Sequence, residues 1–176
     1  MLVFTKLYFV NCKLQKNKNY TLCIMQKPDI QIYRKIGAIL FLLWGILHLW
    51  VPYNGFSEYY KKGTGLHMMI GGETVGMNDL KLPKDDKTML VINNLFLNFV
   101  TNIGSSGILA IIIAYMLWKG INSWIAYLIG VICIGIVDLA FVWFMDLSGI
   151  IKQSFPVIVG PLLWVLAVII TPIGGL

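Results

Sequence analysis

Four long apolar runs decide the solvent in which most of this chain must fold. They lie at residues 36–51, 95–118, 121–145 and 155–170. A helix of about 20 residues is needed to cross the hydrocarbon core of a bilayer. The first and last runs are shorter, so three or four spans fit the pattern, and Trp50, Pro52 and Pro156 at the run ends favour four. We therefore predict an all-α, polytopic membrane protein: a four-helix transmembrane bundle over residues 35–176.

The composition excludes an ordinary soluble domain. Hydrophobic residues make up 58% of the chain and charged residues 12%, whereas soluble domains carry about 25% charged residues. The mean hydropathy is +0.78. The expected partners are therefore the lipid bilayer, a small-molecule ligand, and a further copy or another membrane protein, with no nucleic acid.

Residues 1–34 form a basic tail, in which Asp29 is the only acidic residue. The region shows no periodicity, so we expect a disordered leader, or a natural chain start at Met25. Excess Lys and Arg mark the cytoplasmic side of a membrane protein. The tail therefore favours a multi-pass protein of the plasma membrane with a cytoplasmic N-terminus, although a start at Met25 would remove most of this bias.

The segment 52–88 is predicted as one long loop between the first and second spans. Its middle, residues 63–76, is rich in glycine yet partly apolar. Two alternatives remain: the loop caps the bundle, or it is a mobile surface loop. If it is a cap, His67 and Glu73 are its candidate functional residues.

Polar groups from three spans share one depth in the predicted membrane. Counting about 1.5 Å per residue from Lys35, Trp118 and Trp124 places them roughly 18–24 Å from that face. The second span adds polar residues at steps of three and four, which form a stripe that lipid would penalise. We expect a polar cavity that opens toward the loop side, lined by His48, Asn98, Asn102, Ser105 and Asp138.

Asp138 is the only acidic residue within the apolar runs, and His48 is the one titratable partner that the spans offer. A carboxylate at this depth costs several kcal/mol unless it is neutralised, paired or hydrated. One hypothesis is that the two side chains meet and share or pass a proton. The alternative is that they only fasten the helices together.

Metal and haem sites are weakly supported. The chain has two histidines, so a site would need His48, His67, Glu73 and Asp138 to converge through the loop. The three cysteines share no ligand spacing. We predict no metal, and the sequence indicates no particular cofactor.

The segment Gly45-Ile-Leu-His48-Leu near the end of the first span, followed by a long loop and three further spans, resembles small prokaryotic four-helix membrane proteins of the DoxX-like group. The resemblance covers residues 35–176 in layout. It implies a compact helical bundle with a membrane-associated redox or small-molecule role, and it assigns no catalytic residues.

The function expected from these features is the binding or movement of a small molecule or a proton through the cavity. Two alternatives remain: a structural or assembly subunit of a membrane complex, and a membrane enzyme acting on lipid or quinone. No arrangement of nucleophile and base indicates an enzyme, so we favour a protein that is not one.

Overall fold

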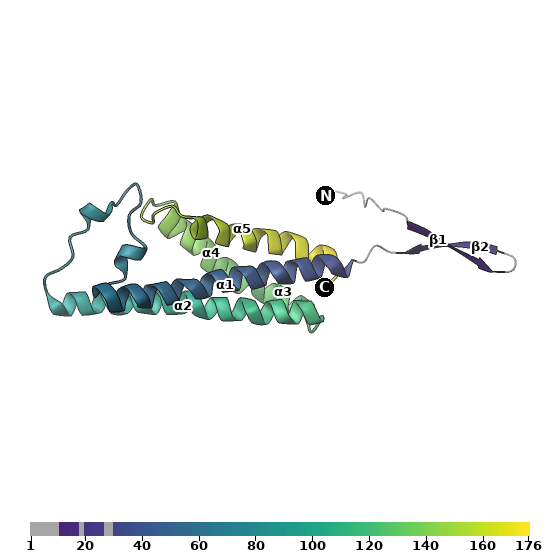
Figure 1. The fold of residues 1–176 in the computed structure, drawn as a ribbon, viewed down its shortest axis with the longest axis horizontal. Helices are drawn as coiled ribbons and strands as arrows, with labels where there is room; N and C mark the ends of the chain where they lie inside the picture. Colours follow the sequence, from purple (N-terminus) through teal and green to yellow (C-terminus); the bar gives the residue numbers. More distant parts are fainter. Residues whose placement is uncertain (1–10, 18–19, 27–29) are drawn as a thin grey trace.

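The computed structural model describes residues 11–17, 20–26 and 30–176, and it confirms the predicted four-helix bundle (Figure 1). Helices α1 (Gln31–Lys62) and α2 (Asp86–Lys119) are the two long spans. The third span is built from α3 (Ser123–Ile129), η3 (Gly130–Ile134), α4 (Gly135–Phe141) and η4 (Val142–Asp146), and the fourth from α5 (Phe155–Ile170) and η5 (Thr171–Gly174). All four are long and apolar enough to cross a membrane.

A β-hairpin precedes the bundle, in a region where the sequence predicts no regular structure. Strands β1 (Asn11–Asn17) and β2 (Tyr20–Gln26) pair antiparallel, with Cys12 opposite Met25. Residues 1–10, 18–19 and 27–29 of the expected tail lie outside the described residues.

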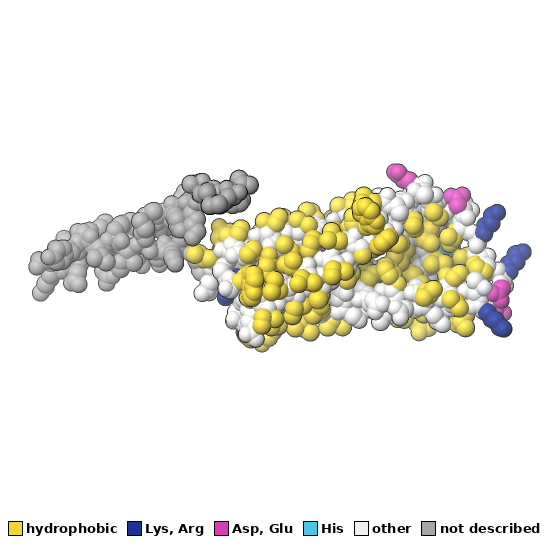
Figure 2. Space-filling view, turned by 180° about the vertical axis from the view of Figure 1, so that it is seen from behind, with side chains coloured by type: hydrophobic (Ala, Val, Ile, Leu, Met, Phe, Trp, Pro, Cys, Tyr) yellow, Lys and Arg dark blue, Asp and Glu magenta, His cyan; other side chains and the backbone are white. Residues whose placement is uncertain are grey.

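The flanks of the bundle carry the side chains that lipid requires. Figure 2 shows hydrophobic side chains along the sides of the bundle and charged ones at the end that bears the long loop. Ile46, Ile112 and Leu139, from three different spans, each expose more than half of their surface. Burying such side chains in hydrocarbon rather than water is favourable by about 25 cal/mol per Å². The bundle is therefore a multi-pass membrane protein.

The first helix does not end before Pro52, so the predicted loop boundaries are wrong. Helix α1 continues through Pro52 to Lys62, and α2 already begins at Asp86, so the loop covers only residues 63–85. Proline removes one backbone N–H and tends to kink a helix rather than always ending it. The helix ends instead at Gly63, whose φ of 74° is the left-handed cap that favours glycine. At about 1.5 Å per residue, α1 and α2 are each longer than the hydrocarbon core is thick.

Helix α1 is the central element and packs closely on α2 through glycines. A Cβ on Gly45 would lie 2.7 Å from the carbonyl oxygen of Gly107, and a Cβ on Gly104 would lie 2.7 Å from Cγ of Pro52. Closer to the start of α1 than this contact, Phe41 and Trp44 are fully buried in the main core. The α1–α2 and α4–α5 pairs then diverge toward the loop end (Figure 1).

The loop folds back across the diverging end. The backbone N–H groups of Gly71 and Gly72 donate to the carbonyl of Ile150, and Ile70 pairs with Ile151. Met69, which is 7% exposed, packs in a second core cluster with residues of α2. Of the two alternatives for the loop, the structure therefore shows the cap.

Candidate functional site

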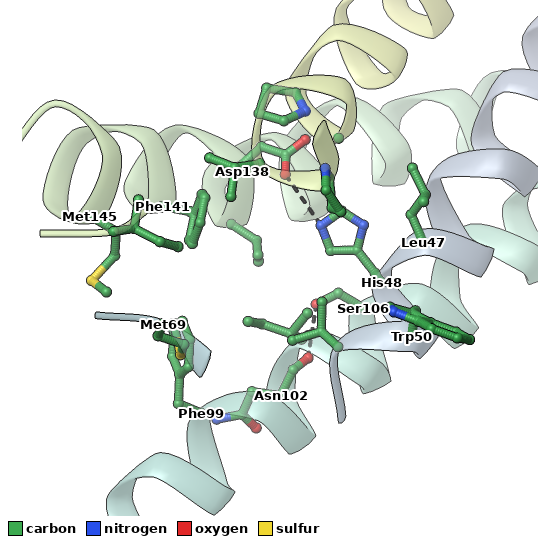
Figure 3. Close-up of a pocket in the computed structure, with 18 of the residues that line it drawn as sticks. Leu47, His48, Trp50, Met69, Phe99, Asn102, Ser106, Asp138, Phe141 and Met145 are labelled. Atoms are coloured by element: carbon green, nitrogen blue, oxygen red, sulfur yellow. Dashed lines mark hydrogen bonds and ion pairs between the residues drawn. The ribbon is translucent and has the colours of Figure 1, made fainter. Parts of the chain in front are cut away.

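A cavity of about 570 Å³ occupies the space between the diverging helix pairs, beneath the loop (Figure 3). Its walls come from α1, α2, the second half of the third span and α5, and its roof comes from η1 (Leu66–Met68) and the residue after it. Most lining side chains are apolar, so the cavity is less polar than the sequence predicts. Its polar side chains are His48, Asn54, Asn102, Ser106, Asp138 and Ser154.

His48 of α1 and Asp138 of α4 face each other at the inner end of the cavity (Figure 3). The distance from His48 Nε2 to Asp138 Oδ1 is 3.6 Å, and Asp138 is 2% exposed. This separation is an ion-pair contact but is too long for a good hydrogen bond. The two groups that the sequence placed at one depth are thus neighbours.

Trp44 completes this group and was not identified from the sequence. Its indole N–H donates to Asp138 Oδ2 at 2.8 Å. Its ring stacks on the imidazole of His48, with 3.4 Å between the ring centroids. Its carbonyl oxygen lies 2.9 Å from His48 Nδ1. The signal in the sequence was the four-residue spacing of Trp44 and His48, which places both on one helix face.

These contacts indicate which ring nitrogen of His48 carries a hydrogen. A carbonyl oxygen can only accept, so Nδ1 of His48 carries a hydrogen and donates to Trp44. Nε2 therefore faces Oδ1 of Asp138. A proton placed between the two side chains would leave the pair without net charge, which would lower the cost of burying it.

The backbone around the pair is shaped to bring it together. Gly160 of α5 leaves room for the imidazole, since a Cβ there would lie 3.2 Å from His48 Cε1. Asp138 stands in a helical segment of seven residues between the π-helical segments η3 and η4. Such wide turns inside helices occur frequently at functional sites.

The polar residues of α2 divide between the cavity and the outer surface. Asn102 and Ser106 line the cavity, whereas Asn98 and Ser105 do not. Asn98, Asn102 and Ser105 are exposed, and part of the predicted stripe therefore lies on the outer face of α2. The inner face is taken by Gly104 and Gly107, which hold α1 close. The spacing identified the stripe but not its direction.

The candidate cap residues lie away from the cavity. His67 lines a separate shallow pocket with Glu58, Lys61 and Lys62. Glu73 is exposed in the loop. The residues that reach into the main cavity from the loop are Met68 and Met69.

The four residues considered for a metal site do not converge. Across the part of the chain that the structure describes, no three His, Cys, Asp or Glu side chains form a group that could hold a metal ion. Comparisons with protein families, curated proteins and solved structures give no match. The functional argument therefore depends on the geometry of the cavity and of its His48–Asp138 pair.

Proposed function

We propose that this protein binds a small, largely apolar molecule in its intramembrane cavity and shares or passes a proton with it at the His48–Asp138 pair. The observation that carries the proposal is that a close imidazole–carboxyl pair borders a cavity of about 570 Å³. Ligand sites in proteins are commonly apolar clefts of this size with a few polar groups at fixed positions.

The cavity favours ligand binding over a purely structural role. A pair that only fastened helices would need no space beside it. Side chains that border empty space lose dispersion contacts, so a void of this size is costly unless something fills it. Phe99, Phe141 and Met145 line the cavity and suit an apolar occupant.

Native mass spectrometry of protein released gently from membranes tests the proposal. Ala140 lines the cavity, and Ala140→Trp should displace a bound molecule because the indole occupies its space. Leu139→Trp is the matched control, since Leu139 is 61% exposed on the outer surface. We expect wild type and the control to carry the same bound mass and Ala140→Trp to lose it. Wild type without any bound molecule would contradict the proposal.

We also propose that the bundle lies in the plasma membrane with its N-terminus in the cytoplasm. The basic tail supports this orientation. With four spans, the start of α1 and the end of η5 lie at one end of the bundle and the loop of residues 63–85 at the other (Figure 1). A cysteine placed at the exposed Asn78 should react with a membrane-impermeant thiol reagent from outside intact cells. Reaction only after the cells are opened would reverse the orientation.

A further inference from the structure

We propose that the molecule bound in the cavity is an uncharged amphiphile that resides in the bilayer. It enters sideways, between α2 and the second half of the third span, with its polar head following a line of polar side chains on α2. This inference rests on the proposed function and names the class of ligand and its route.

The charge of the cavity selects an uncharged head. Among the described residues, no Lys or Arg lines the cavity, so nothing there balances a phosphate or carboxylate. Its one acidic side chain, Asp138, is already matched by His48. A charged head would have to leave water or headgroups for apolar surroundings without a counter-charge, which is strongly unfavourable. A hydroxyl or carbonyl can instead exchange hydrogen bonds with the pair.

The roof covers part of the cavity at the loop end. Met69 and Ile151 line the cavity and are each 7% exposed. The loop is held over them by backbone hydrogen bonds from Gly71 and Gly72 to the carbonyl of Ile150. A molecule approaching along the bundle axis therefore meets a layer of packed apolar side chains.

The cavity reaches the surface on a flank of the bundle. Asn102 of α2 and Phe144 of η4 both line the cavity and are both exposed, Phe144 at 67%. Helix α2 packs against α3 and η3, at the far end of the third span from η4. The opening between α2 and η4 consequently faces the bilayer.

A line of polar groups leads along α2 into this opening. Asn94, Asn98, Asn102 and Ser106 follow at four-residue steps, so they lie above one another on the helix at intervals of about 6 Å. The amide of Asn102 donates to Asn98 Oδ1 at 2.8 Å, and the hydroxyl of Ser106 donates to the carbonyl of Asn102 at 3.1 Å. Hydrocarbon offers such groups no partner. We name these four residues the amide line.

The amide line ends at the depth of the His48–Asp138 pair. Gly107, the residue after Ser106, packs against His48, with a Cβ at Gly107 lying 3.2 Å from the Cβ of His48. The line therefore spans the path from the loop end of α2 to the inner end of the cavity. A polar head moving along it keeps hydrogen-bonding neighbours while its apolar body stays in lipid or in the cavity.

Photolabelling in phosphatidylcholine nanodiscs tests both parts of the inference. Two probes with the same diazirine-bearing alkyl chain are compared, a fatty alcohol and the corresponding fatty acid as its carboxylate. Mass spectrometry then locates the label. We expect the alcohol to label Phe99, Phe141 and Met145 in the cavity, and the acid to label them at least tenfold less.

The route is tested by Asn98→Leu, because Asn98 belongs to the amide line but does not line the cavity. We expect the initial rate of cavity labelling by the alcohol to fall at least fivefold, with the oligomeric mass unchanged. Ser105→Ala is the control, since Ser105 is exposed on the same helix but lies outside the line. Its labelling rate should equal that of wild type.

The outcomes separate this inference from the proposed function. Equal cavity labelling by the two probes, or an unchanged rate in Asn98→Leu, would overturn the inference and leave ligand binding intact. A change of oligomeric mass in Asn98→Leu would show that the amide line is an interface with a second copy, which also overturns it. Absence of cavity label from both probes would count against the proposed function as well.

Discussion

Replacing Asp138 by Asn should separate the proposed proton-handling role of this residue from its structural role. In wild type, Asp138 accepts a hydrogen bond from the indole of Trp44 and faces Nε2 of His48. An Asn side chain can satisfy both neighbours, because its oxygen accepts from Trp44 and its NH₂ group donates to the unprotonated Nε2. The Asn amide differs from the Asp carboxyl group in that it cannot gain or lose a proton near neutral pH.

The expected magnitudes follow from these contacts. Because Asn keeps both partners, we expect the free energy of unfolding to change by less than about 1 kcal/mol. Asp138→Leu leaves the buried indole N–H of Trp44 and the cavity-facing Nε2 of His48 without protein partners. Each unsatisfied group costs about 1–3 kcal/mol, so the leucine variant should lose roughly 2–4 kcal/mol once the added apolar contacts offset part of the loss.

Two measurements check this prediction. Unfolding in mixed micelles by titration with a denaturing detergent gives the stability of each variant. The ¹⁵N resonances of the His48 ring report which nitrogen carries the hydrogen: in Asp138→Asn, Nδ1 should keep it, because the Trp44 carbonyl remains its acceptor. Equal destabilisation by Asn and Leu, or a hydrogen on Nε2 alone in the Asn variant, would refute the hydrogen-bond assignment at the pair.

Three further predictions concern the surrounding framework. Gly45→Ala should separate α1 from α2, because its Cβ would lie 2.7 Å from the carbonyl oxygen of Gly107. We expect the free energy of unfolding to fall by about 1–3 kcal/mol in the same detergent titration. The control Ile46→Ala, at a lipid-facing position, should lower it less. Gly72→Val should release the loop, since a Cβ there overlaps the backbone around Gly149, and limited proteolysis within residues 73–85 should become faster; an unchanged rate would show that the cap does not depend on this contact. Hydrogen bonds from Thr88 and Lys87 hold the pKa of Asp85 below its ordinary value of 3.8. The helix cap that Asp85 forms on α2 is therefore complete above pH 3.8, and it is lost as the pH falls through the lowered pKa of Asp85 in the folded protein. Amide exchange in the first turn of α2 should then accelerate, whereas an Asp85→Asn variant should show no such step.

The sequence was sufficient for the four spans and for the depth of His48 and Asp138, because helix rise converts residue number directly into position across a bilayer. It was insufficient where a neighbour decides the outcome. Pro52 reads as a helix end until the space that Gly104 leaves for its ring is known. Asn98 reads as a cavity residue because spacing gives the common face of a helix but not what that face meets.

Trp44 was not predicted as a site residue for a different reason. A tryptophan in an apolar run already has an ordinary explanation as a core or lipid-facing side chain, and only the fold reveals its indole hydrogen bond to an acid 94 positions later. The loop is a similar case. His67 and Glu73 have the ionisable side chains that suggest function in a sequence, but the apolar side chains of Met68 and Met69 are the ones that line the cavity as its roof.

The wide turns on either side of Asp138 imply that the third span holds extra residues relative to a regular helix, so the effect of a deletion there should depend on its position. Segments η3 and η4 each give their hydrogen bonds a longer reach than a regular helix does, as in the bond from the Leu147 N–H to the Val142 carbonyl. Deleting a single residue from η3 would restore ordinary pitch and leave the residues beyond it on nearly the same helix faces. Deleting Ile136 from the regular turns of α4 would instead rotate everything beyond it by about 100°. The carboxyl group of Asp138 would then point away from His48, so a one-residue deletion at Ile136 should be more damaging than one within η3.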